Sequence, residues 1–412
     1  MTISVLVIGA GPAGMMAAGN AALRGCSVTL ADKNQRVGRK LMITGKGRCN
    51  ITNNCDTTQF IANVPTNGRF LYSAINGFTP QDTIDFFTNL GLEIKTERGN
   101  RVFPVSDKAV DVVDAMKRFV KQSKCTIIQR EITSLIFKDG TVKGAVASNG
   151  EKLYADKIVI ACGGKSYPLT GSTGQGYILA RQVGHTIVAP KPSLVSLESS
   201  DEFCKELQGL SLRNISLTVT DLNNKEIYKD FGEMIFTHYG VSGPVILSAS
   251  AHLRHSKSTG HVISIDLKPA LSEEQLDKRI LRDFDEFKNR DIANSLVKLL
   301  PSTIVPIVFE KSGIPPQTKC NSVTKEQRRA LMRALKGFTV KINGFRPIEE
   351  AIITSGGVAV NEINPKTMES KIIKNLYFAG EVIDVDAYTG GFNLQIAFST
   401  GNLAGISVAN MC

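Results

Sequence analysis

Two short apolar runs near the N-terminus flank a stretch of helical character. The run at 5–8 (VLVI) leads into Gly9, Gly11 and Gly14, which have G-x-G-x-x-G spacing, and an alanine-rich stretch follows. A second apolar run then ends in Asp32. Short apolar runs bounded by turn residues are typical of buried strands, whereas the alanine-rich stretch is typical of a helix. The pattern predicts a strand, a tight turn, a helix and a second strand.

This unit has the layout that binds a dinucleotide. Gly9 permits a sharp turn, Gly11 lets the backbone approach a pyrophosphate, and Gly14 lets the helix pack closely on the sheet. The free amides at the start of the helix then face the phosphates. Asp32, at the end of the second strand, would accept hydrogen bonds from a ribose hydroxyl and repel a 2′-phosphate, so NADP is disfavoured as the occupant.

The later pattern predicts further helices and strands. Helical periodicity covers 81–91, which ends at Gly91, and 108–121. Strand-like runs follow, with a hairpin turn at 138–140, and a Gly/Ser/Thr loop then leads into a helix at 176–184. The predicted strands lie at 125–129, 134–140, 142–150 and 157–164, the last of which contains Gly163.

The character of the sequence changes near Pro190. Residues 191–265 are rich in β-branched residues and turns, 272–300 and 325–336 have charged helical patterns, and 301–320 contain four prolines, which predict a linking segment. A helix rich in small residues is predicted from about Asn393. We predict a nucleotide-binding domain (1–190 plus 345–412), an inserted β-rich domain (191–271 plus 337–344) and a helical insertion (272–336).

Composition narrows the class of protein. The chain of 412 residues is 42% hydrophobic, which is ample for a core. Apolar runs long enough for a transmembrane helix are absent, and the glycine motif uses the N-terminal run, so we expect neither a membrane span nor a signal peptide. Eight cysteines without a C-x-x-C pair indicate a cytoplasmic protein with no zinc site. His252, His255 and His261 lack metal-ligand context and are expected at the surface.

The chain carries a net charge of +11, and residues 1–190 hold 23 Lys and Arg against 13 Asp and Glu. Several of these cations crowd the stretch 33–48. They would form a solvated face that also neutralises cofactor phosphates, or a surface for a polyanion such as RNA. The sequence contains no RNA-binding module, so charge does not decide between the two.

The C-terminal segment favours FAD over NAD. A predicted strand ends at Gly380 and Glu381, and a Gly-Gly pair ten residues later opens a helix. Glu381 would bind hydroxyl groups of the cofactor, and the amides near Gly391 would face the flavin N1 and C2 carbonyl. The segment 171–176 lacks the spacing of a second dinucleotide motif. A nicotinamide donor, NAD(P)H, would therefore dock transiently on the flavin face.

Four motifs resemble the BaiN-like (YhiN) family of bacterial FAD-dependent oxidoreductases: GRKLMITGKGRCNITN, HYGVSGPVIL, TMESK and FAGEVIDVDAYTGGFNLQIA. The resemblance spans about residues 3–408. It implies a Rossmann-like FAD domain of the glutathione-reductase type with an inserted β-barrel domain and a small helical subdomain. The predicted cofactor-binding set is Gly9, Gly11, Pro12, Ala13, Gly14, Asp32, Lys33, Arg39, Lys40, Gly45, Asn50, Gly163, Gly380, Glu381, Gly391, Phe392, Asn393 and Leu394.

The resemblance also implies a reaction. Members of the family reduce C=C bonds of 3-oxo bile-acid intermediates or make dihydrouridine in 23S ribosomal RNA, and in both the alkene is conjugated to a carbonyl. We therefore expect a flavin-dependent ene reductase with NAD(P)H as donor, acting on a small enone or, alternatively, on a ribosomal RNA uridine. The sequence is also compatible with an amine oxidase-like flavoenzyme and with a non-catalytic, flavin-holding RNA-binding protein. It leaves the oligomeric state open.

Reduction of such a bond requires a proton donor. Cys49 is the first candidate, because the neighbouring Arg48 would lower its pKa, although it could equally be a small packing residue. Tyr388, just before the Gly-Gly pair, is the second. His238 could reach the flavin from the β-rich domain or stabilise a turn. Arg48 itself could bind a carbonyl or phosphate, or form a salt bridge.

Overall fold

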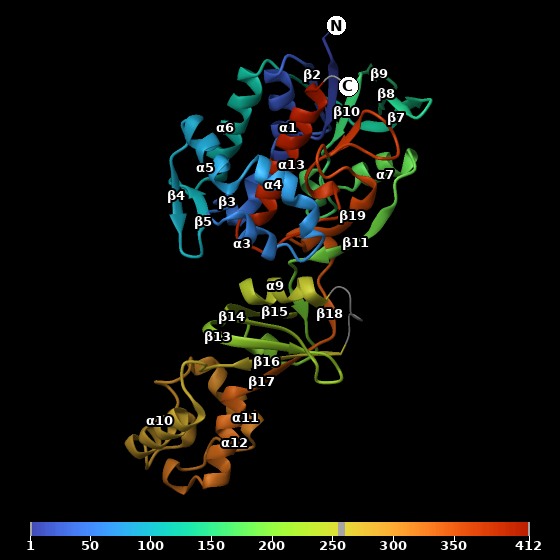
Figure 1. Ribbon diagram of the computed structural model, residues 1–412. Coiled ribbons are helices and arrows are strands. Elements are labelled where there is room, and N and C mark those ends of the chain that lie inside the picture. The colour runs from blue at the N-terminus through green and yellow to red at the C-terminus, as the bar shows by residue number, and fades with distance from the viewer. Residues whose placement is uncertain (1, 254–259, 411–412) are drawn as a thin grey trace. The chain divides into compact units, whose positions relative to one another are not determined.

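The computed structural model describes residues 2–253 and 260–410 (Figure 1). The chain divides into two compact units, Met1–Ser193 with Pro347–Cys412, and Leu194–Arg346. The first unit is therefore built from both ends of the chain, and the second is a single continuous insertion. His255 lies outside the described residues.

A five-stranded parallel sheet forms the centre of the first unit, in the order β20-β10-β1-β2-β6. Its strands alternate with helices along the chain, which gives an α/β Rossmann-like fold and confirms the predicted fold class at that level. Strands β1 and β10 are almost wholly buried, which explains their uninterrupted apolar sequences. The strands are β1 (Ser4–Ile8), β2 (Ser27–Asp32), β6 (Thr126–Gln129), β10 (Lys157–Ile160) and β20 (Leu376–Phe378).

Helices α1 (Pro12–Leu23) and α13 (Phe392–Ala409) lie side by side over this sheet (Figure 1). Glycines on α13 make this close packing possible. A Cβ on Gly401 would lie 2.3 Å from the Ala13 carbonyl oxygen, and one on Gly405 would lie 2.5 Å from the Ala17 carbonyl oxygen. The small residues of both helices therefore bring the two ends of the chain into one core.

Smaller sheets complete the first unit. They are β3-β5-β4, β7-β8-β9 and β11-β19, all antiparallel. Their strands are β3 (Thr52–Asn53), β4 (Ile94–Glu97), β5 (Arg101–Pro104), β7 (Ile132–Lys138), β8 (Thr141–Ala147), β9 (Lys152–Tyr154), β11 (Ile187–Ser193) and β19 (Ile353–Val358). The remaining helices are α2 (Arg39–Ile43), α3 (Thr57–Ala62), α4 (Tyr72–Gly77), α5 (Pro80–Asn89), α6 (Ala109–Gln122) and α7 (Gln175–Gln182).

The second unit contains a seven-stranded antiparallel sheet in the order β17-β16-β13-β14-β15-β12-β18. Closure of this sheet into a barrel stays a prediction. The strands are β12 (Leu197–Glu198), β13 (Ser211–Thr220), β14 (Glu226–Thr237), β15 (Gly240–Ser242), β16 (His261–Asp266), β17 (Phe338–Ile342) and β18 (Gly344–Phe345). The helices are α8 (Phe203–Glu206), α9 (Pro244–Leu253), α10 (Glu273–Glu286), α11 (Val305–Ser312) and α12 (Lys325–Lys336).

Two details of the second unit differ from the sequence predictions. The prolines of 301–320 do not make the whole segment a linker, because Pro306 lies in the first turn of α11, where a missing amide costs nothing. His261 is only 3% exposed rather than a surface residue, because it begins the internal strand β16. None of the helices within 2–253 and 260–410 is long and apolar enough to cross a bilayer.

Candidate functional site

A groove in the first unit opens at the carboxyl ends of the parallel strands, beside the glycine motif. Gly9 has a φ of +105°, and a Cβ there would lie 2.5 Å from the Ala161 carbonyl oxygen. A Cβ on Gly14 would lie 1.8 Å from the Gly9 carbonyl oxygen. By contrast, a Cβ on Gly11 would meet no protein atom within 4 Å, although Gly11 lines the groove. Gly9 and Gly14 therefore serve packing, whereas Gly11 leaves space for a ligand.

The first turn of α1 faces this space with free backbone amides. Gly11 is the N-cap residue, so there is no side-chain cap, and Pro12 occupies the first turn. The first turn also lacks an acidic side chain. Uncapped amides and the positive end of the helix dipole attract phosphate groups, so this helix start fits the pyrophosphate of a dinucleotide.

Asp32 is fixed at the end of β2 by hydrogen bonds to both carboxylate oxygens. Its Oδ2 accepts from the Ala10 amide at 2.7 Å, and its Oδ1 accepts from the Asn34 amide at 2.7 Å and from Asn34 Nδ2 at 3.0 Å. Asp32 lines the groove. A carboxylate held in this way keeps lone pairs that a ribose hydroxyl can use, and this role of Asp32 stays a prediction.

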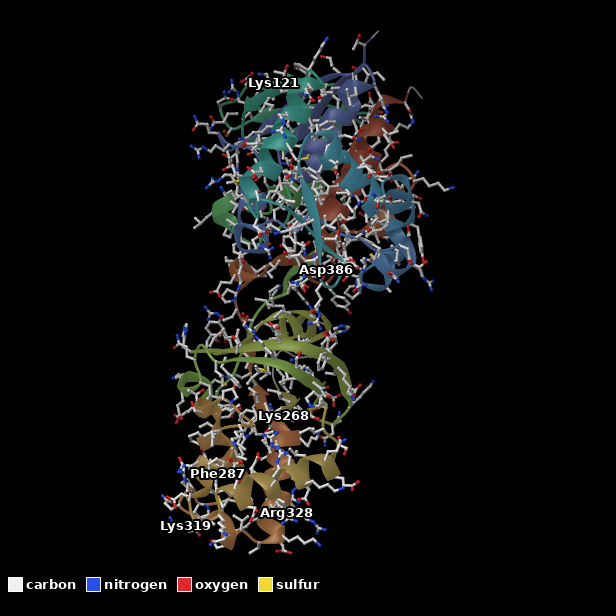
Figure 2. The ribbon with its side chains drawn as sticks, turned by 90° about the vertical axis from the view of Figure 1, so that its left-hand side faces the viewer. Lys121, Lys268, Phe287, Lys319, Arg328 and Asp386 are labelled. Carbon is white, nitrogen blue, oxygen red and sulfur yellow. The ribbon has the colours of Figure 1, made fainter. Side chains whose placement is uncertain are left out.

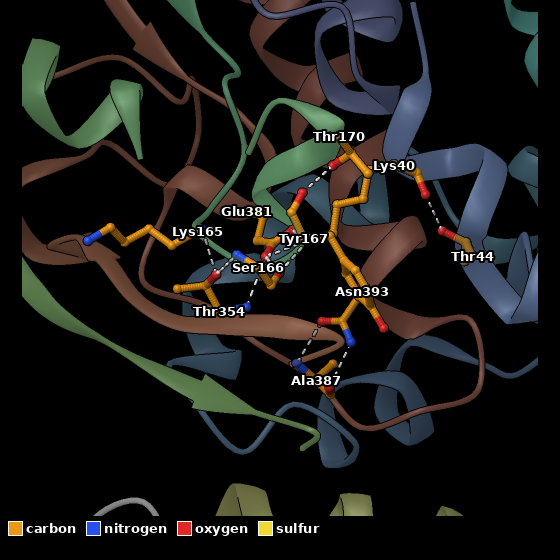
Figure 3. A network of polar contacts seen from close by, with 10 residues as sticks. All are labelled: Lys40, Thr44, Lys165, Ser166, Tyr167, Thr170, Thr354, Glu381, Ala387 and Asn393. Carbon is orange, nitrogen blue, oxygen red and sulfur yellow. Dashed lines mark hydrogen bonds and ion pairs between the residues drawn. The ribbon is translucent and has the colours of Figure 1, made fainter. Parts of the chain in front are cut away.

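Lys40 and Glu381 form the centre of a polar network in the same groove (Figure 3). Lys40 Nζ lies 2.6 Å from Glu381 Oε2 and donates to Ser166 Oγ at 2.7 Å. Glu381 Oε1 also accepts from the Thr354 amide at 2.9 Å. Thr354 Oγ1 in turn accepts from the amides of Lys165 and Ser166. The network joins α2, the loop after β10, β19 and the turn after β20.

The start of α13 reaches the groove from the other end of the chain. Its N-cap is Gly391, without a side-chain cap, and Asn393 and Leu394 line the groove. The Asn393 side chain is bonded within the protein: its Oδ1 accepts from the Ala387 amide at 2.9 Å and its Nδ2 donates to the Ala387 carbonyl at 2.7 Å (Figure 3). It holds the preceding loop, so the free amides of the first turn remain for a cofactor.

The groove brings together most of the predicted cofactor-binding residues. It is lined by Gly9, Gly11, Pro12, Ala13, Asp32, Lys33, Arg39, Lys40, Gly163, Gly380, Glu381, Asn393 and Leu394. The side chains of Lys33 and Arg39 donate to Thr173 Oγ1 and Asn34 Oδ1, each at 2.8 Å. The predicted residues Gly14, Gly45, Asn50, Gly391 and Phe392 are not among its lining residues.

Sequence reasoning missed many of the lining residues, including one group after β6 and one at the start of β19. Arg130, Glu131 and Ile132 follow β6, the strand beside β2. The rule that ligands bind at the carboxyl ends of parallel strands could have identified them. Ile352 and Ile353 also line the groove, but they lie just before and at the start of β19, after the inserted unit, and no local signal marks them.

Cys49 differs from its predicted environment. It is wholly buried in the apolar core of the first unit, and this burial raises its pKa, so the expectation of a lowered pKa is wrong. Arg48 does not bring its charge to the thiol. Its Nη2 lies 2.5 Å from Glu97 and 2.6 Å from Asp107, and its guanidinium stacks over Phe103 at 4.2 Å. Arg48 was predicted either to bind a carbonyl or phosphate or to form a salt bridge, and in the structure it forms the salt bridge.

The other two candidate catalytic residues lie in different units. Tyr388 is half-buried in the loop before α13, and its amide donates to the Asn63 carbonyl at 3.1 Å. His238 lies in the second unit, between β14 and β15, where it is exposed and packs edge-on against Tyr239. The roles of both residues stay predictions.

The residues present fit FAD. Two uncapped helix starts border the groove, Gly11 leaves room at one of them, and Asp32 and Glu381 offer fixed carboxylates. When FAD is bound, the start of α1 would hold its pyrophosphate and Asp32 its adenosine ribose. Glu381 would bind hydroxyl groups of the linking chain, and the start of α13 would face the pyrimidine side of the flavin.

Comparison with known proteins agrees with this fit, since the HI0933-like protein Rossmann domain family matches residues 3–407. The chain is 30% identical over 411 residues to 3-dehydro-bile acid delta(4,6)-reductase of Clostridium scindens. It is 29% identical over 410 residues to ribosomal RNA dihydrouridine synthase of Haemophilus influenzae. Each alignment covers 98% of both chains. Among solved structures, 3-ketosteroid delta1-dehydrogenase from Sterolibacterium denitrificans has a TM-score of 0.53 at 13% identity, with 99% of both chains covered. The chain therefore belongs to the HI0933-like family of FAD-dependent Rossmann oxidoreductases, which confirms the BaiN-like resemblance of its motifs.

Proposed function

We propose that this flavin oxidoreductase reduces a C=C bond conjugated to a carbonyl, with NAD(P)H as the electron donor. The observation that carries the proposal is that the uncapped starts of α1 and α13 border one groove. A simple NAD-dependent dehydrogenase would need only the first of these helix starts, to bind the pyrophosphate. The second one, at the flavin end, favours negative charge on the group placed against it.

Reduced FAD, when bound, supplies a hydride to the alkene carbon β to the carbonyl. The chain must then deliver a proton to the α-carbon. Cys49 has no exposed surface through which to touch a substrate, so it is not the donor that we propose. Tyr388 remains the candidate in the first unit, because it precedes the Gly-Gly pair and its backbone is fixed to Asn63.

A small enone of the 3-oxo bile-acid or steroid type is the first substrate we propose. The relative from Clostridium scindens acts on a compound of this class according to its name, and it aligns over 98% of both chains. Such a substrate is mostly apolar, so its binding would depend on an apolar pocket rather than on the basic surface.

A uridine of 23S ribosomal RNA is the second candidate substrate, and the charge of the chain favours it. The net charge is +11, and the residues 1–190 alone carry 23 Lys and Arg against 13 Asp and Glu. This excess of positive charge would attract the phosphates of RNA, whereas a small neutral enone would gain nothing from it. The relative from Haemophilus influenzae is named for this reaction on ribosomal RNA.

The test is anaerobic reoxidation of the reduced holoenzyme, followed by flavin absorbance. A 3-oxo-Δ4 steroid enone and unmodified 23S ribosomal RNA are offered separately. Rapid reoxidation by one of them, with its reduced product detected, identifies the substrate class. Oxygen consumption with peroxide release from small amines, without NAD(P)H, would instead indicate an amine oxidase. Salt-sensitive RNA binding without flavin turnover would indicate a non-catalytic protein.

A further inference from the structure

The β4–β5 hairpin carries two exposed arginines beside the loop that leads into α13. Arg101 on β5 pairs directly with Asn53 on β3. Residues that are opposite one another in an antiparallel ladder project from the same face, with Cβ atoms about 5 Å apart. Asn53 Nδ2 donates to the Gly390 carbonyl and to the Gly99 carbonyl, both at 3.0 Å. Arg101 therefore stands on the face of the sheet that holds the Gly390 loop.

The positive charge of this hairpin exceeds its negative charge. Its carboxylate Glu97 is already paired with Arg48, and the neighbouring Asp107 binds Arg48 and, at 2.7 Å, Lys95. Arg98 and Arg101 are exposed, and neither has an ion-pair partner among the described residues. Arg101 Nε donates to the Arg98 carbonyl at 3.1 Å, which holds the guanidinium at the hairpin tip.

A third exposed cation, Arg69, lies on another segment that contacts the same loop. Arg69 lies in the short helix η2 (Gly68–Leu71), and the preceding Asn67 donates through Nδ2 to the Asp384 carbonyl at 2.7 Å. The Asp384 carboxylate also accepts from Asn67 Nδ2, at 3.0 Å. The loop before α13 is thus bound by two segments, and each of them presents exposed arginine.

We propose that Arg69, Arg98 and Arg101 bind the phosphodiester backbone of an RNA strand whose base is reduced at the α13 end of the groove. The inference rests on the proposed function with RNA, its second candidate, as the substrate, and on the flavin lying at that end of the groove. A guanidinium matches a phosphate with two parallel hydrogen bonds. The three arginines are exposed and none lines the groove, so they suit an extended polyanion on the surface rather than a dinucleotide in a pocket.

The test measures RNA affinity of the FAD-loaded full-length chain by fluorescence anisotropy. The probe is a labelled single-stranded RNA, titrated at several salt concentrations from about 50 to 200 mM. In the double variant Arg98→Ala/Arg101→Ala we expect Kd to rise at least about tenfold, and the salt slope of log Kd to decrease by about 1 to 2. Arg69→Ala is expected to act in the same direction.

Lys121→Glu is the matched control. Lys121 is exposed near the end of α6, and Figure 2 shows it at the opposite end of the first unit from Asp386, which belongs to the loop before α13. Its RNA affinity should equal that of the parent chain. Flavin absorbance and the thermal unfolding midpoint of the holoenzyme serve as cofactor and fold controls for every variant, and both should be retained.

The proposal is overturned if RNA affinity and salt slope of the arginine variants stay within twofold of the parent. It is equally overturned if the variants raise only the KM for the nicotinamide dinucleotide. If the alanine double variant loses FAD, Arg98→Lys/Arg101→Lys replaces it. A smaller loss of RNA affinity with an unchanged salt slope would support contacts to phosphate. An unchanged Kd would refute bidentate hydrogen bonds from the arginines to phosphate. If neither the enone nor RNA reoxidises the parent enzyme, the proposed reaction is wrong. The anisotropy titration then still tests whether the three arginines bind RNA.

Discussion

Lys40 and Glu381 are 341 residues apart in the sequence, yet Lys40 Nζ lies 2.6 Å from Glu381 Oε2 in the groove. Their side chains are only 22% and 14% exposed, and Ser166 and Thr354 complete the hydrogen bonds around them. An ion pair with this degree of burial depends on both partners, because removal of one leaves the other poorly solvated. We therefore expect the pair to couple FAD binding to the assembly of both ends of the chain.

Removal of one partner of this pair should cost more than removal of both. We expect Lys40→Met to lower the free energy of unfolding by about 2–4 kcal/mol and to weaken FAD binding, because Glu381 is left unpaired. The double variant Lys40→Met/Glu381→Leu should recover part of the lost stability of the apoprotein, though not its FAD affinity. Denaturant unfolding and flavin titration measure the two effects. Additive losses of stability would contradict a coupled pair.

The glycine motif offers a matched pair of substitutions. Gly14→Ala should destabilise the apoprotein by at least about 3 kcal/mol, because its Cβ would lie 1.8 Å from a backbone oxygen. Gly11→Ala should cost no more than about 1 kcal/mol, because no protein atom lies within 4 Å of the new methyl group and only the N-cap preference for glycine is lost. The same methyl group should weaken FAD binding at least about tenfold. Normal FAD affinity in Gly11→Ala would place the pyrophosphate elsewhere.

Asp32→Ala should weaken FAD binding by about 10- to 100-fold. The substitution removes the carboxylate offered to the ribose, and hydrogen bonds to charged groups are worth about 1.5–3 kcal/mol. It also leaves the amides of Ala10 and Asn34 without their acceptor. Flavin titration of the apoprotein measures the affinity. Asp32→Asn, which keeps one acceptor oxygen, should lose less FAD affinity than Asp32→Ala. Equal losses of FAD affinity in the two variants would argue against a direct contact between Asp32 and the ribose.

Asn393→Ala should release the loop before α13. Both polar atoms of the Asn393 side chain bond to Ala387, at 2.9 Å and 2.7 Å, so the Ala387 amide loses its partner. We expect hydrogen exchange at residues 384–391 to accelerate about tenfold or more, and flavin reduction by NAD(P)H to slow. Unchanged exchange in this loop would show that the flanking contacts hold it without Asn393.

Partly buried thiols should make the protein lose stability at alkaline pH. Burial raises the pKa of Cys55 to about 11 and that of Cys125 to about 12. An unfolded thiol titrates near pH 8.5, so above that pH the unfolded chain releases protons that the folded chain retains. The free energy of unfolding should therefore fall as pH rises from about 9 toward the folded pKa values. Urea unfolding between pH 7 and about 10.5, with reductant present, measures this.

A matched variant isolates the thiol contribution from that of other groups that titrate at high pH. Cys125→Ala should make the decline between pH 9 and 10.5 shallower than in the parent chain. An identical pH dependence in the two proteins would show that Cys125 does not carry the effect. Cys49, which is buried completely, should resist alkylation in the folded protein over the same range.

The sequence by itself determined the elements that rest on local patterns. The strand, glycine turn and helix at 4–23 follow from apolar spacing and from glycine's lack of a side chain, and Asp32 follows from its place at the end of β2. The helices at 80–89 and 109–122 lie within a few residues of their predictions, because each repeats its apolar residues at helical spacing. The helix at 392–409 also lies close to its prediction, which came from the Gly-Gly pair and the small residues. The motifs also identified the family.

Only the tertiary structure decided which side chains are used and how. The burial of Cys49 and the pairing of Arg48 with Glu97 and Asp107 depend on the β3-β5-β4 sheet, whose partners come from distant parts of the chain. The same is true of Ile353, which reaches the groove from β19 beyond the inserted unit. Pattern along the chain reports local preference, whereas burial and ion pairing are set by neighbours that are remote in sequence, and these exist only once the sheets have formed.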